Sequence, residues 1–489
     1  MEPRIQNMDV LTSHGNIEGR KAALAILEAG LQASDPYSNT RKLLHLEGNR
    51  LTISGRQFEP RNDPRSGDEV IDLSKVRHIY VLGAAKGIQR VALAIEDALG
   101  DRLTGGHIID KKGSPIILKR IGVTLGAHPV PDEDCVKGCE KILEITKTLT
   151  RDDLVFTCTG SGVSALLTMP VPGVTIEEVS KTTYMMQIER GAPTGDLNAI
   201  RNHLDVLKGG KMSRYIHPAR AIHIVADDPS DYNILMNTNS YLHNLPDNGA
   251  YTYELAIANL KKWEAWEAVP VSVRRFLEKA DPAYATVKKP EFEKMDFRVF
   301  GVMPGYRKTG KFPAAIKKAQ ELGYKPVILA ESLSAEAVHA GKYAAAIART
   351  VERIGQPFEP PCALFSSGEM IVTVGEETGI GGRNQEFCLS AAQNIVGSKN
   401  IVIGSVDTDG TDGPGTQYTK GPEGMPACLG GGIIDGYTMD EAKAAGVNVV
   451  EEMKHHNTSP PLWKMGNGIL ASANISMLDF TVILVTRKA

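Results

Sequence analysis

Apolar positions along the first half of the chain recur with two different periods. Apolar residues at helical spacing predict a helix over Ile17–Ala33. The run LLHLEGNRLTI, with Gly48 and Asn49 at its turn, predicts a hairpin. Strands are then expected at residues 79–82, 107–110, 121–125, 154–158 and 220–226, and helices at residues 86–99, 132–149 and 164–168. This alternation predicts an α/β fold with a doubly wound, mostly parallel sheet that carries helices on both faces.

A polar and charged stretch interrupts the alternation at about residues 278–294, and we interpret it as a linker. Beyond it the alternation resumes. Strands are expected at residues 297–303, 326–329, 363–365, 370–374, 401–405 and 480–485, and helices at residues 311–322, 334–354 and 384–395. We therefore expect two α/β domains with a cleft between them: a Rossmann-like domain over residues 1–280 and a smaller α/β domain over residues 295–489.

Composition and charge narrow the functional classes. The chain has 489 residues, with 55 Lys and Arg against 58 Asp and Glu, which gives a net charge of -3. This near balance argues against a protein that coats nucleic acid and against a polybasic membrane binder. The first residues lack the apolar core of a signal peptide, and no window approaches 18 uninterrupted apolar residues. Six Cys without a CxxC pair suit a reducing compartment, so we expect a cytoplasmic protein.

Two glycine-containing loops follow predicted strands, where open α/β sheets bind their ligands. Lys86 lies in the loop of residues 83–87, whose backbone N–H groups and charge favour a phosphate or carboxylate. A solvated Lys in a tight turn is the alternative. Residues 160–165 match the dinucleotide fingerprint GxGxxA, but Glu177 and Glu178 lie at a helix start and not at the end of a second strand. A turn that cradles an anion fits better, and a plain tight turn remains open.

Polar residues also line the segment DLNAIRNHLDVLKGGK. Asn198 and Arg201 stand three residues apart and so share a helix face. Arg201 could grip a carboxylate through two hydrogen bonds, with His203 and Lys208 further along. A solvated polar helix face is the alternative interpretation.

Residues 305–312 come close to the P-loop pattern GxxxxGK[ST] between a predicted strand and a predicted helix. Phe312 stands where a Ser or Thr would hold Mg²⁺, and no convincing Walker-B Asp is found. We therefore do not expect a P-loop.

The densest group of chemically capable residues lies in two loops of the second half. Residues 379–386 open a helix with a Gly-rich turn, where Arg383 suits neutralisation of a phosphate in a transition state. Residues 407–414 follow an apolar strand and hold three Asp. Asp409 or Asp412 could bind Mg²⁺ or orient a hydroxyl. An exposed turn or an incidental cation site is the alternative.

Taken together, these motifs resemble the class II glycerate kinase family, whose C-terminal domain is called MOFRL. The resemblance runs from about Gly19 to Leu484. It is carried by AHPVPDE (127–133), SALL (164–167), LNAIRNHLDVLKGGK, GGRNQE (381–386) and TDGTDGP (408–414). It implies ATP- and Mg²⁺-dependent transfer of phosphate to the 2-hydroxyl of D-glycerate. It also implies a doubly wound N-terminal domain and a smaller C-terminal α/β domain.

The resemblance also implies roles for individual residues. The catalytic residues would be Lys86 and Arg383. The substrate would be bound by Ser161, Ser164, Asn198, Arg201 and Lys208. The nucleotide would be bound by Gly83, Gly381, Gly382, Asp409 and Gly410. Mg²⁺ would be held by Asp227, Asp231, Asp409 and Asp412.

Several loops depart from the family pattern. Val163 replaces a Gly, Tyr232 replaces an Asp, residues 237–240 and 471–476 differ, and a Gly-rich stretch is added at residues 415–432. These changes fit altered substrate choice, and they also fit lost kinase activity. The alternatives are therefore another enzyme on a small organic acid, such as an NAD-dependent hydroxypyruvate reductase, and a non-catalytic organic-acid-binding protein. In each case we expect the chain to bind a small hydroxy acid. We expect it to bind neither nucleic acid nor a membrane, and a homodimer is possible.

Overall fold

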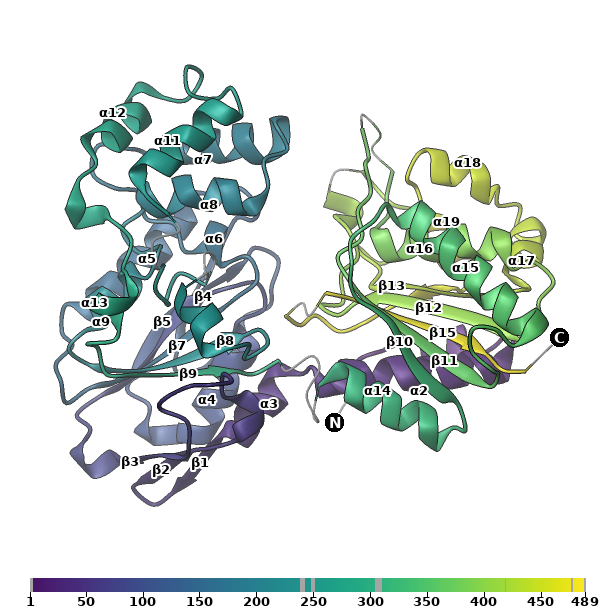
Figure 1. Ribbon diagram of the computed structural model, residues 1–489, viewed down its shortest axis with the longest axis horizontal. Coiled ribbons are helices and arrows are strands. Elements are labelled where there is room, and N and C mark those ends of the chain that lie inside the picture. The colour runs from purple at the N-terminus through teal and green to yellow at the C-terminus, as the bar shows by residue number, and fades with distance from the viewer. Residues whose placement is uncertain are drawn as a thin grey trace. The chain divides into compact units, whose positions relative to one another are not determined.

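The structure is a computed structural model. It describes residues 3–237, 242–247, 251–303, 310–375, 377, 379–417, 419–475 and 478–487. Packing divides the chain into two compact units, which Figure 1 shows as ribbons. We call residues 36–304 the parallel-sheet unit, and residues 1–35 together with residues 305–489 the mixed-sheet unit. Each unit has its own six-stranded sheet and its own hydrophobic core.

Six parallel strands form the main sheet of the parallel-sheet unit. They are β4 (Ile79–Ala84), β5 (Gly105–Lys111), β6 (Gly122–Gly126), β7 (Leu154–Gly160), β8 (Arg220–Ala226) and β9 (Phe297–Gly301). Their order across the sheet is β6-β5-β4-β7-β8-β9, and every neighbouring pair is parallel. The chain therefore builds outward from β4 in one direction and from β7 in the other. This is the doubly wound order, so that prediction is confirmed.

The strand order places a switch point between β4 and β7. At such a point the connections after two neighbouring strands leave in opposite directions, and the crevice between them is where open α/β sheets bind ligands. All seven residues of β7 are buried, as expected for a parallel strand covered on both faces. The loops that follow Ala84 and Gly160 therefore begin at the natural ligand site of this unit.

Helices surround this sheet and also form a separate layer. Near the sheet lie α3 (Pro36–Leu43), α4 (Gln89–Leu99), α5 (Glu133–Thr146), α6 (Val163–Leu166), α9 (Lys211–Ile216), α10 (Tyr232–Asn237) and α13 (Lys289–Phe292). The separate layer consists of α7 (Ile176–Tyr184), α8 (Thr194–His203), α11 (Tyr253–Lys262) and α12 (Val271–Lys279). These four helices share one core cluster, and Figure 1 shows them together at one end of the unit. The layer presents α8, which carries several candidate site residues.

A small antiparallel sheet completes the parallel-sheet unit. It consists of β1 (Leu44–Glu47), β2 (Arg50–Ile53) and β3 (Glu69–Asp72). Glu47 pairs with Arg50 around Gly48, whose φ is +59°. The predicted hairpin is therefore confirmed.

The mixed-sheet unit holds six further strands. They are β10 (Lys325–Leu333), β11 (Cys362–Gly368), β12 (Ile401–Asp407), β13 (Gly431–Asp435), β14 (Gly468–Ile469) and β15 (Asp479–Val485). Their order is β10-β11-β15-β12-β13-β14, where only β10 and β11 are parallel neighbours. The last strand of the chain therefore lies between β11 and β12, with Asp479 opposite both Gly368 and Asp407.

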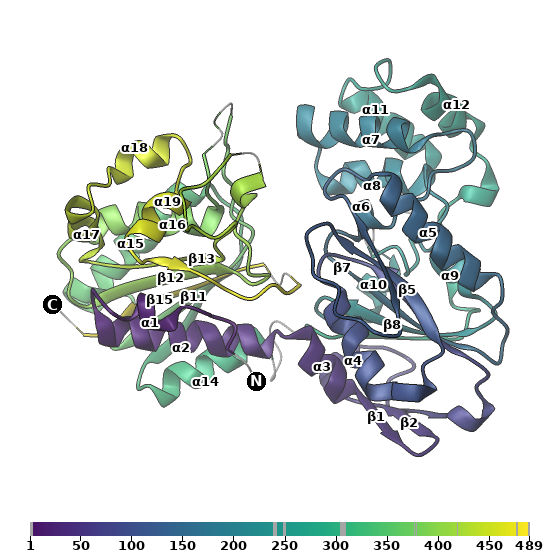
Figure 2. The same ribbon diagram turned by 180° about the vertical axis from the view of Figure 1, so that it is seen from behind.

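Two layers of helices cover this mixed sheet. On one face α2 (Ile17–Ala33) and α14 (Lys311–Glu321) pack with Phe365, Val402 and Phe480. On the other face α15 (Ala337–Ile354) and α16 (Arg383–Asn394) pack with Leu364 and Ile483. Successive strand residues point to opposite faces, so the same apolar strands supply both cores. Figures 1 and 2 show α2 and α14 together on one side of the sheet. The remaining helices are α1 (Met8–Leu11), α17 (Thr438–Ala444), α18 (Val449–Lys454) and α19 (Ser459–Lys464).

The division into units differs from the domains expected at residues 1–280 and 295–489. Helix α2 packs with α14 and with β12 and β15, so residues 1–35 belong to the mixed-sheet unit. The supposed linker forms α13, and Phe292 in it is buried. Strand β9, which was expected to open the second domain, pairs with β8 and closes the first sheet. The places of α2 and β9 depend on contacts between distant segments, which a local sequence pattern does not reveal.

One expected strand was wrong, and β3, β13 and β14 were not predicted. The strand expected at residues 370–374 is absent from that described segment, where Ile371 makes one isolated bridge to Glu336. Strand β13 was missed because its sequence, GGIID, lies within the Gly-rich stretch. Glycine is required there, since Gly431 has a φ of +154° and a Cβ would lie 2.0 Å from the Ser405 carbonyl oxygen.

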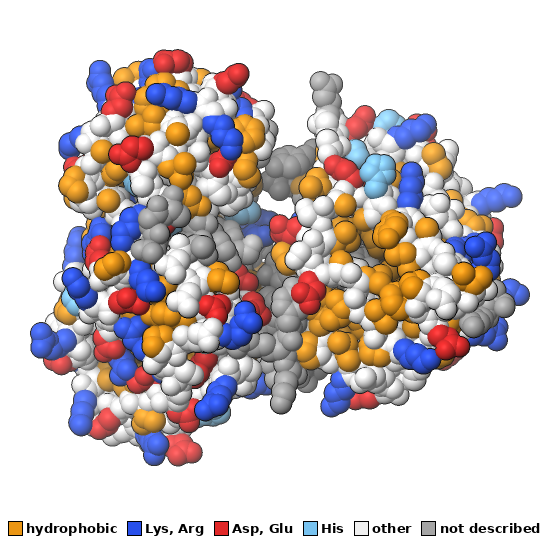
Figure 3. All heavy atoms as spheres, in the orientation of Figure 1, with side chains coloured by type: hydrophobic (Ala, Val, Ile, Leu, Met, Phe, Trp, Pro, Cys, Tyr) orange, Lys and Arg blue, Asp and Glu red, His pale blue; other side chains and the backbone are white. Residues whose placement is uncertain are grey.

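The surface is of mixed charge. Figure 3 shows Lys and Arg side chains interspersed with Asp and Glu side chains over the face that it draws. Among the described helices, none is both long and apolar enough to cross a lipid bilayer.

Candidate active site

The loops after β4 and β7 are bound to each other at the switch point. The backbone N–H of Lys86 donates to the Ser161 carbonyl oxygen at 2.9 Å. Asp110, at the end of β5, accepts a 2.7 Å hydrogen bond from the Gly87 N–H. Gly87 has a φ of +69°, which favours glycine. Lys86 and Ser161, both predicted from the sequence, are therefore brought together, and Asp110, which was not predicted, braces their loop.

Gly162 has the side chains of Lys86 and His128 as close neighbours. Its φ is +82°, and a Cβ there would lie 2.7 Å from Lys86 Cγ and 3.1 Å from His128 Cδ2. His128 belongs to the AHPVPDE motif but had no predicted role. Val163, which stands where the family has a Gly, is buried in the core cluster of the unit.

Arg201 is a buried cation that has no carboxylate partner among the described residues. Its side chain lies on α8, the residue is 6% exposed, and its Nη2 donates to Gln187 Oε1 at 2.9 Å. In the part of the chain that the structure describes, no acidic residue forms an ion pair with Arg201 or influences its pKa. Burial therefore lowers the pKa of Arg201 to about 10. Because an isolated buried charge is costly, this arrangement calls for an anion from outside.

Several cations converge on His128. Burial lowers the pKa of His128 to about 3, and Lys86, Lys111 and Arg201 lower it further in the same direction. Lys86 and Arg201 are thus close enough to act on one imidazole. His128 is neutral near pH 7, so it adds no positive charge of its own.

Asn198 lies one helical turn before Arg201 on the same face of α8. It is fully buried, and neither its amide nitrogen nor its amide oxygen has a hydrogen-bond partner among the described residues. A buried amide without partners is rare in proteins and is a group that a ligand can satisfy. We call Lys86, His128, Asn198 and Arg201, with Ser164 described below, the anion site.

Ser164 joins this neighbourhood through a second histidine. Its Oγ lies 2.8 Å from His243 Nε2. Burial lowers the pKa of His243 well below its usual value, and Lys208 and Arg201 add to that effect. Arg201 therefore lies near both histidines, and the predicted pair of Ser164 and Arg201 shares one region.

Lys208, unlike Arg201, is paired with a carboxylate of the described part of the protein. Its Nζ is buried and donates to Thr168 Oγ1 at 2.7 Å and to Asp205 Oδ2 at 2.8 Å. This satisfied ion pair ties α6 to the end of α8, and the contacts give it a packing role. The role in substrate binding predicted for Lys208 stays a prediction.

The predicted metal ligands of this unit lie in the loop after β8. Asp231 accepts on Oδ1 from the Asn233 N–H at 3.0 Å and on Oδ2 from Asn62 Nδ2 at 2.7 Å. It thereby caps α10. Asp227 accepts from the Asp228 N–H at 2.7 Å. Tyr232, where the family has an acidic residue, is buried with its hydroxyl 3.3 Å from Glu293 Oε1.

A second polar group occurs in the mixed-sheet unit, at the ends of β11 and β12 and the start of β15. Arg383, the first residue of α16, donates from Nε to Asp479 Oδ1 at 2.7 Å and from Nη2 to Asp407 Oδ2 at 2.9 Å. Burial alone would lower the pKa of Arg383, but Asp479 and Asp407 raise it above its usual value. Burial raises the pKa of both carboxyls, against the effect of Arg383. We call Arg383, Asp407 and Asp479 the arginine–aspartate cluster.

Asp412, in the neighbouring loop, caps the N-terminus of helix α16. Its Oδ1 accepts from the Asn384 N–H at 3.1 Å, and its Oδ2 accepts from the Gln385 N–H at 2.9 Å. Burial raises the pKa of Asp412 to about 6, with Asp479 acting in the same direction. Both carboxylate oxygens are therefore committed to the helix N-terminus.

Four of the five predicted nucleotide-binding residues lie in the loops of the mixed-sheet unit, at residues 381–382 and 409–410. A Cβ at Gly382 would lie 2.2 Å from the Asp412 carbonyl oxygen, and a Cβ at Gly381 would lie 2.4 Å from Thr458 Oγ1. Gly410 has a φ of +88°, and Asp409 accepts from the Thr411 N–H at 2.7 Å. These glycines allow close packing of the loops. Gly83 lies in β4, in the other unit, where a Cβ would lie 1.9 Å from the Cys158 carbonyl oxygen.

Two residues of this region were not recognised as site residues. Asp479 precedes the last apolar strand, and only the sheet order brings it beside Arg383. Lys311 stood in the near match to the P-loop at residues 305–312, of which residues 305–309 lie outside the described residues. Lys311 Nζ donates to Ser367 Oγ at 2.6 Å. Burial lowers the pKa of Lys311 to about 8, while Asp479 and Asp407 act in the opposite direction.

The four predicted Mg²⁺ ligands belong to different units. Asp227 and Asp231 lie in the parallel-sheet unit, and Asp409 and Asp412 lie in the mixed-sheet unit. Within the described ranges, no group of three or more His, Cys, Asp or Glu is arranged to hold a metal ion.

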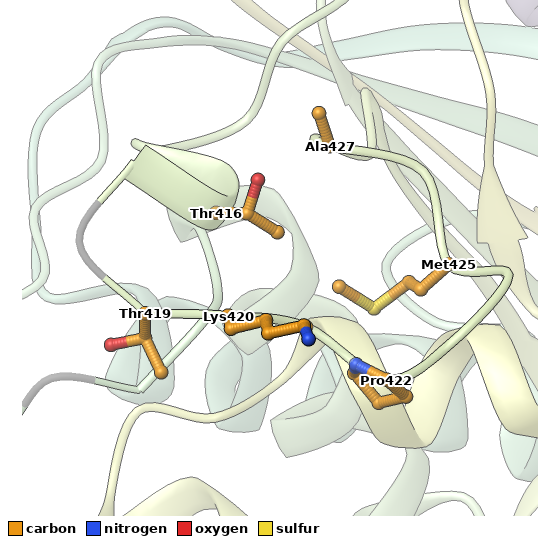
Figure 4. Close-up of a pocket in the computed structure, with 7 residues that line it drawn as sticks. Thr416, Thr419, Lys420, Pro422, Met425 and Ala427 are labelled. Atoms are coloured by element: carbon orange, nitrogen blue, oxygen red, sulfur yellow. The ribbon is translucent and has the colours of Figure 1, made fainter.

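The added Gly-rich stretch forms a hollow of its own. The hollow has a volume of about 440 Å³, and Figure 4 shows the side chains around it. It is lined by Thr416, Thr419, Lys420, Gly421, Pro422, Met425 and Ala427. The Thr416 N–H donates to the Ala427 carbonyl oxygen at 2.8 Å and closes the loop. None of these lining residues is a candidate site residue.

Comparisons with known proteins agree with the fold and the motifs. A family model described as a domain of unknown function (DUF4147) matches residues 22–278, and the MOFRL family model matches residues 362–474. The chain is 29% identical to the glycerate 2-kinase of Pyrococcus horikoshii, over 96% of this chain and 98% of that protein. It is 28% identical to the D-glycerate 2-kinase of Thermotoga maritima, over 85% and 92% respectively. The crystal structure of glycerate kinase from Thermotoga maritima matches with a TM-score of 0.71 and 26% identity, over 95% of this chain and 99% of that one. The chain therefore belongs to the class II glycerate kinase family, whose C-terminal domain is the MOFRL domain.

Proposed function

We propose that the chain is an ATP-dependent kinase that phosphorylates a hydroxyl of glycerate or of a related small hydroxy acid. The family supports the reaction class, since its members named above are glycerate kinases. One observation carries the choice of substrate class: Arg201 is buried at the anion site without a carboxylate partner among the described residues.

The anion site suits a small carboxylate. A guanidinium binds a carboxylate through two parallel, charge-assisted hydrogen bonds, which fix its orientation as well as its charge. Asn198 offers an amide on the same helix face, and Lys86 adds a second positive charge. The substrate would therefore be held by its carboxylate, which leaves its hydroxyls for reaction.

Phosphoryl transfer depends on positioning and on neutralising charge on the transferred group. Lys86 and Arg383 are the residues that we propose for this work. Lys86 lies in a loop at the ligand end of the parallel sheet, and Arg383 begins a helix behind a Gly-rich turn. Asp479 and Asp407 hold two edges of the Arg383 guanidinium, so its direction is fixed before any ligand binds.

We also propose that the nucleotide enters as a complex with Mg²⁺, which neutralises charge on the phosphates when bound. Mg²⁺ usually takes one or two carboxylates and completes its shell with phosphate oxygens and water. Asp231 and Asp412 fit this role poorly, because both oxygens of each carboxylate already accept hydrogen bonds. Asp227, in the parallel-sheet unit, and Asp409, in the mixed-sheet unit, stay separate candidate ligands, and this part of the proposal rests on the preference of Mg²⁺ for carboxylates.

The reductase alternative loses its local support. The GxGxxA turn leads into α6, which is only four residues long, whereas the dinucleotide fingerprint opens a full helix. Glu178 forms a capping box with Thr175 at the start of α7 and does not end a strand. The turn instead helps to place Lys86 and Ser164.

The test is turnover of a panel of hydroxy acids with ATP and Mg²⁺, with products identified by ³¹P NMR. The panel contains D-glycerate, tartronate, erythronate, threonate and hydroxypyruvate. We expect a phosphate ester from at least one hydroxy acid and none when EDTA is added. Because residues 471–476 and Tyr232 depart from the family, we expect an acid other than glycerate to be the best substrate. Oxidation of NADH by hydroxypyruvate, without ester formation, would contradict the proposal. The cytoplasmic location and the homodimer stay predictions.

A further inference from the structure

Ser164 and His243 form a buried pair whose hydrogen-bond direction can be deduced. Ser164 Oγ lies 2.8 Å from His243 Nε2. On the other side of the ring, the Gly209 N–H points at His243 Nδ1 over 3.4 Å. A backbone N–H can only donate, so Nδ1 is the accepting nitrogen of this imidazole. Nε2 then carries the hydrogen and donates it to Ser164 Oγ.

The protonation state of His243 supports the same direction. The residue is 1% exposed, and burial together with Lys208 and Arg201 disfavours the imidazolium. The positively charged or titratable groups that face it are Lys208, Arg201 and Lys211, and all three act in the same sense. His243 is therefore a neutral ring with one hydrogen, fixed on Nε2.

The glycines of the LKGG segment hold this histidine in place. Besides the Gly209 bond to the ring, the Gly210 N–H donates to the His243 carbonyl oxygen at 2.9 Å. Gly209 and Gly210 have φ values of +65° and +84°, and a Cβ at Gly209 would lie 2.5 Å from Thr286 Cγ2. Only glycine allows both N–H groups to face the histidine at once.

We propose that His243 is a positioning residue that turns Ser164 into a hydrogen-bond donor toward an anionic oxygen at the anion site. A hydroxyl that accepts a hydrogen bond from Nε2–H keeps its own hydrogen for another partner. Carboxylate and phosphate oxygens carry no hydrogen and need donors. Gly162, which lies beside Lys86 and His128, precedes Ser164 by two residues, and Arg201 lies near His243. The pair is thus built for binding an anion and not for activating Ser164 as a nucleophile. The inference rests on the proposed function only in naming a hydroxy acid as the anion.

The direction of the bond can be read by NMR. In the full-length protein labelled with ¹⁵N-histidine, we expect His243 to show the neutral Nε2–H tautomer across pH 5 to 9. A His243 signal in the Nδ1–H form, or one that titrates near pH 6.5 (the ordinary histidine pKa), would overturn the proposal. This measurement needs no substrate, so it remains decisive even if the kinase proposal fails.

Binding measurements test the consequence. We expect Ser164→Ala and His243→Leu each to weaken binding of D-glycerate or inorganic phosphate by about tenfold or more, the scale of one hydrogen bond to a charged group. The double variant should lose little beyond either single variant, because both remove the same bond. Additive losses would contradict the pairing. If His243→Leu bound both probes as tightly as the wild type, the positioning role would be wrong.

Two controls separate positioning from folding and from nucleophilic chemistry. His223→Leu removes another fully buried histidine, whose Nδ1 lies 2.7 Å from Thr157 Oγ1, and it should leave probe binding unchanged. His243→Gln, which can still donate a side-chain N–H to Ser164, should recover part of the binding lost in His243→Leu. A fluorophosphonate reagent should not label Ser164, and labelling there would show an activated nucleophile instead.

Discussion

At the residue scale, the two buried cations near α8 differ in what surrounds them. Arg201 has an amide partner and no carboxylate among the residues described, whereas Lys208 is paired with Asp205 at 2.8 Å. The first arrangement is unsatisfied without a ligand, and the second is complete within the fold. The difference supports the binding role proposed for Arg201 and gives no such support for Lys208, although the sequence alone placed both residues in the same class.

We expect Arg201→Met to fold with unchanged or increased stability, because it removes a buried charge that lacks a counter-charge. Lys208→Met should lower the free energy of unfolding by about 3–5 kcal/mol, because it leaves Asp205 buried without its partner. Urea unfolding at pH 7 measures both. If Arg201→Met proved the more destabilised of the two, the assignment of Arg201 to the anion site would be in error.

Removing the two proposed catalytic cations should cost activity while the fold survives. Arg383→Met should also lower the free energy of unfolding, because the buried Asp407 and Asp479 lose their partner. Lys86→Met and Arg383→Met should each lower kcat by about a hundredfold or more, the scale of losing one contact to charge in a transition state. Circular dichroism should show folded protein in both cases. Turnover near that of the wild type in either variant would remove that residue from the proposed machinery.

Lys311 gives a pH dependence whose sign can be worked out. Its pKa is about 8 in the folded protein, against 10.5 for an exposed lysine, because burial disfavours the charge. Between pH 8 and pH 10.5 the Lys311 amine binds more protons in the unfolded chain than in the folded protein. The free energy of unfolding therefore rises with pH over this range. The rise from this group is at most roughly 1.4 kcal/mol per pH unit. Lys311→Met should therefore show a flatter profile than the wild type in urea unfolding at pH 7, 8, 9 and 10. Identical slopes would mean that Lys311 keeps an ordinary pKa.

At the scale of elements, the N-terminus of a helix and the loops after strands hold the proposed catalytic side chains in place. α16 presents Arg383 because Asp412 accepts the N–H groups of Asn384 and Gln385. The parallel sheet presents Lys86 because the loops after β4 and β7 are bound together across the switch point. In both places a loop from a distant part of the chain supplies the bond that fixes the site residue.

Loss of the α16 cap should be measurable by itself. Asp412→Ala should lower the free energy of unfolding by about 1–2 kcal/mol, because two backbone N–H groups at the helix start lose their acceptors. Asp440→Ala, in the first turn of α17 where the side chain is exposed, should change it by less than about 0.5 kcal/mol. Equal effects of the two substitutions would indicate that Asp412 does not cap the helix.

Most elements could be predicted from the sequence because their signals are local. Helix α2 was expected over Ile17–Ala33 and has those bounds, and β8 was expected over Arg220–Ala226 and has those bounds. The place of β9 in the first sheet could not be predicted, since it depends on pairing with β8. β13 was hidden because glycines, which weaken the strand pattern, are required by its close approach to β12.

The candidate site follows the same rule. Lys86, Arg201 and Arg383 could be picked out because they stand in recognisable motifs. Asp110, His243 and Asp479 could not, because each acts through a partner far along the chain. The charge balance that distinguishes Arg201 from Lys208 also depends on the folded structure. Motifs therefore pointed to candidate site residues, and contacts between distant segments added the candidates that no motif revealed.

At the scale of the whole molecule, the N-terminal helix joins two distant parts of the sequence. Leu24, Leu27 and Leu31 of α2 belong to the same core cluster as Phe480 and Val482. The mixed-sheet unit therefore needs residues 1–35 to bury one face of its sheet. The parallel-sheet unit has its own cores and needs no part of that helix.

We expect residues 36–304 to fold as an isolated chain with a cooperative thermal transition. Residues 305–489 alone should aggregate or remain partly unfolded, because one apolar face of the mixed sheet would be exposed. Adding residues 1–35 as a peptide should restore dispersed NMR signals. A well-folded 305–489 chain without that peptide would contradict the division into units.

The most direct test of the account is the steady-state kinetics of the wild type and Arg201→Met with the best acid of the panel, ATP and Mg²⁺. The account predicts ATP-dependent formation of a phosphate ester by the wild type. For Arg201→Met it predicts a KM for the acid raised by about a hundredfold, consistent with losing a charge-assisted carboxylate contact, while the KM for ATP changes little. No ester from any hydroxy acid, or an unchanged KM for the acid in Arg201→Met, would contradict it.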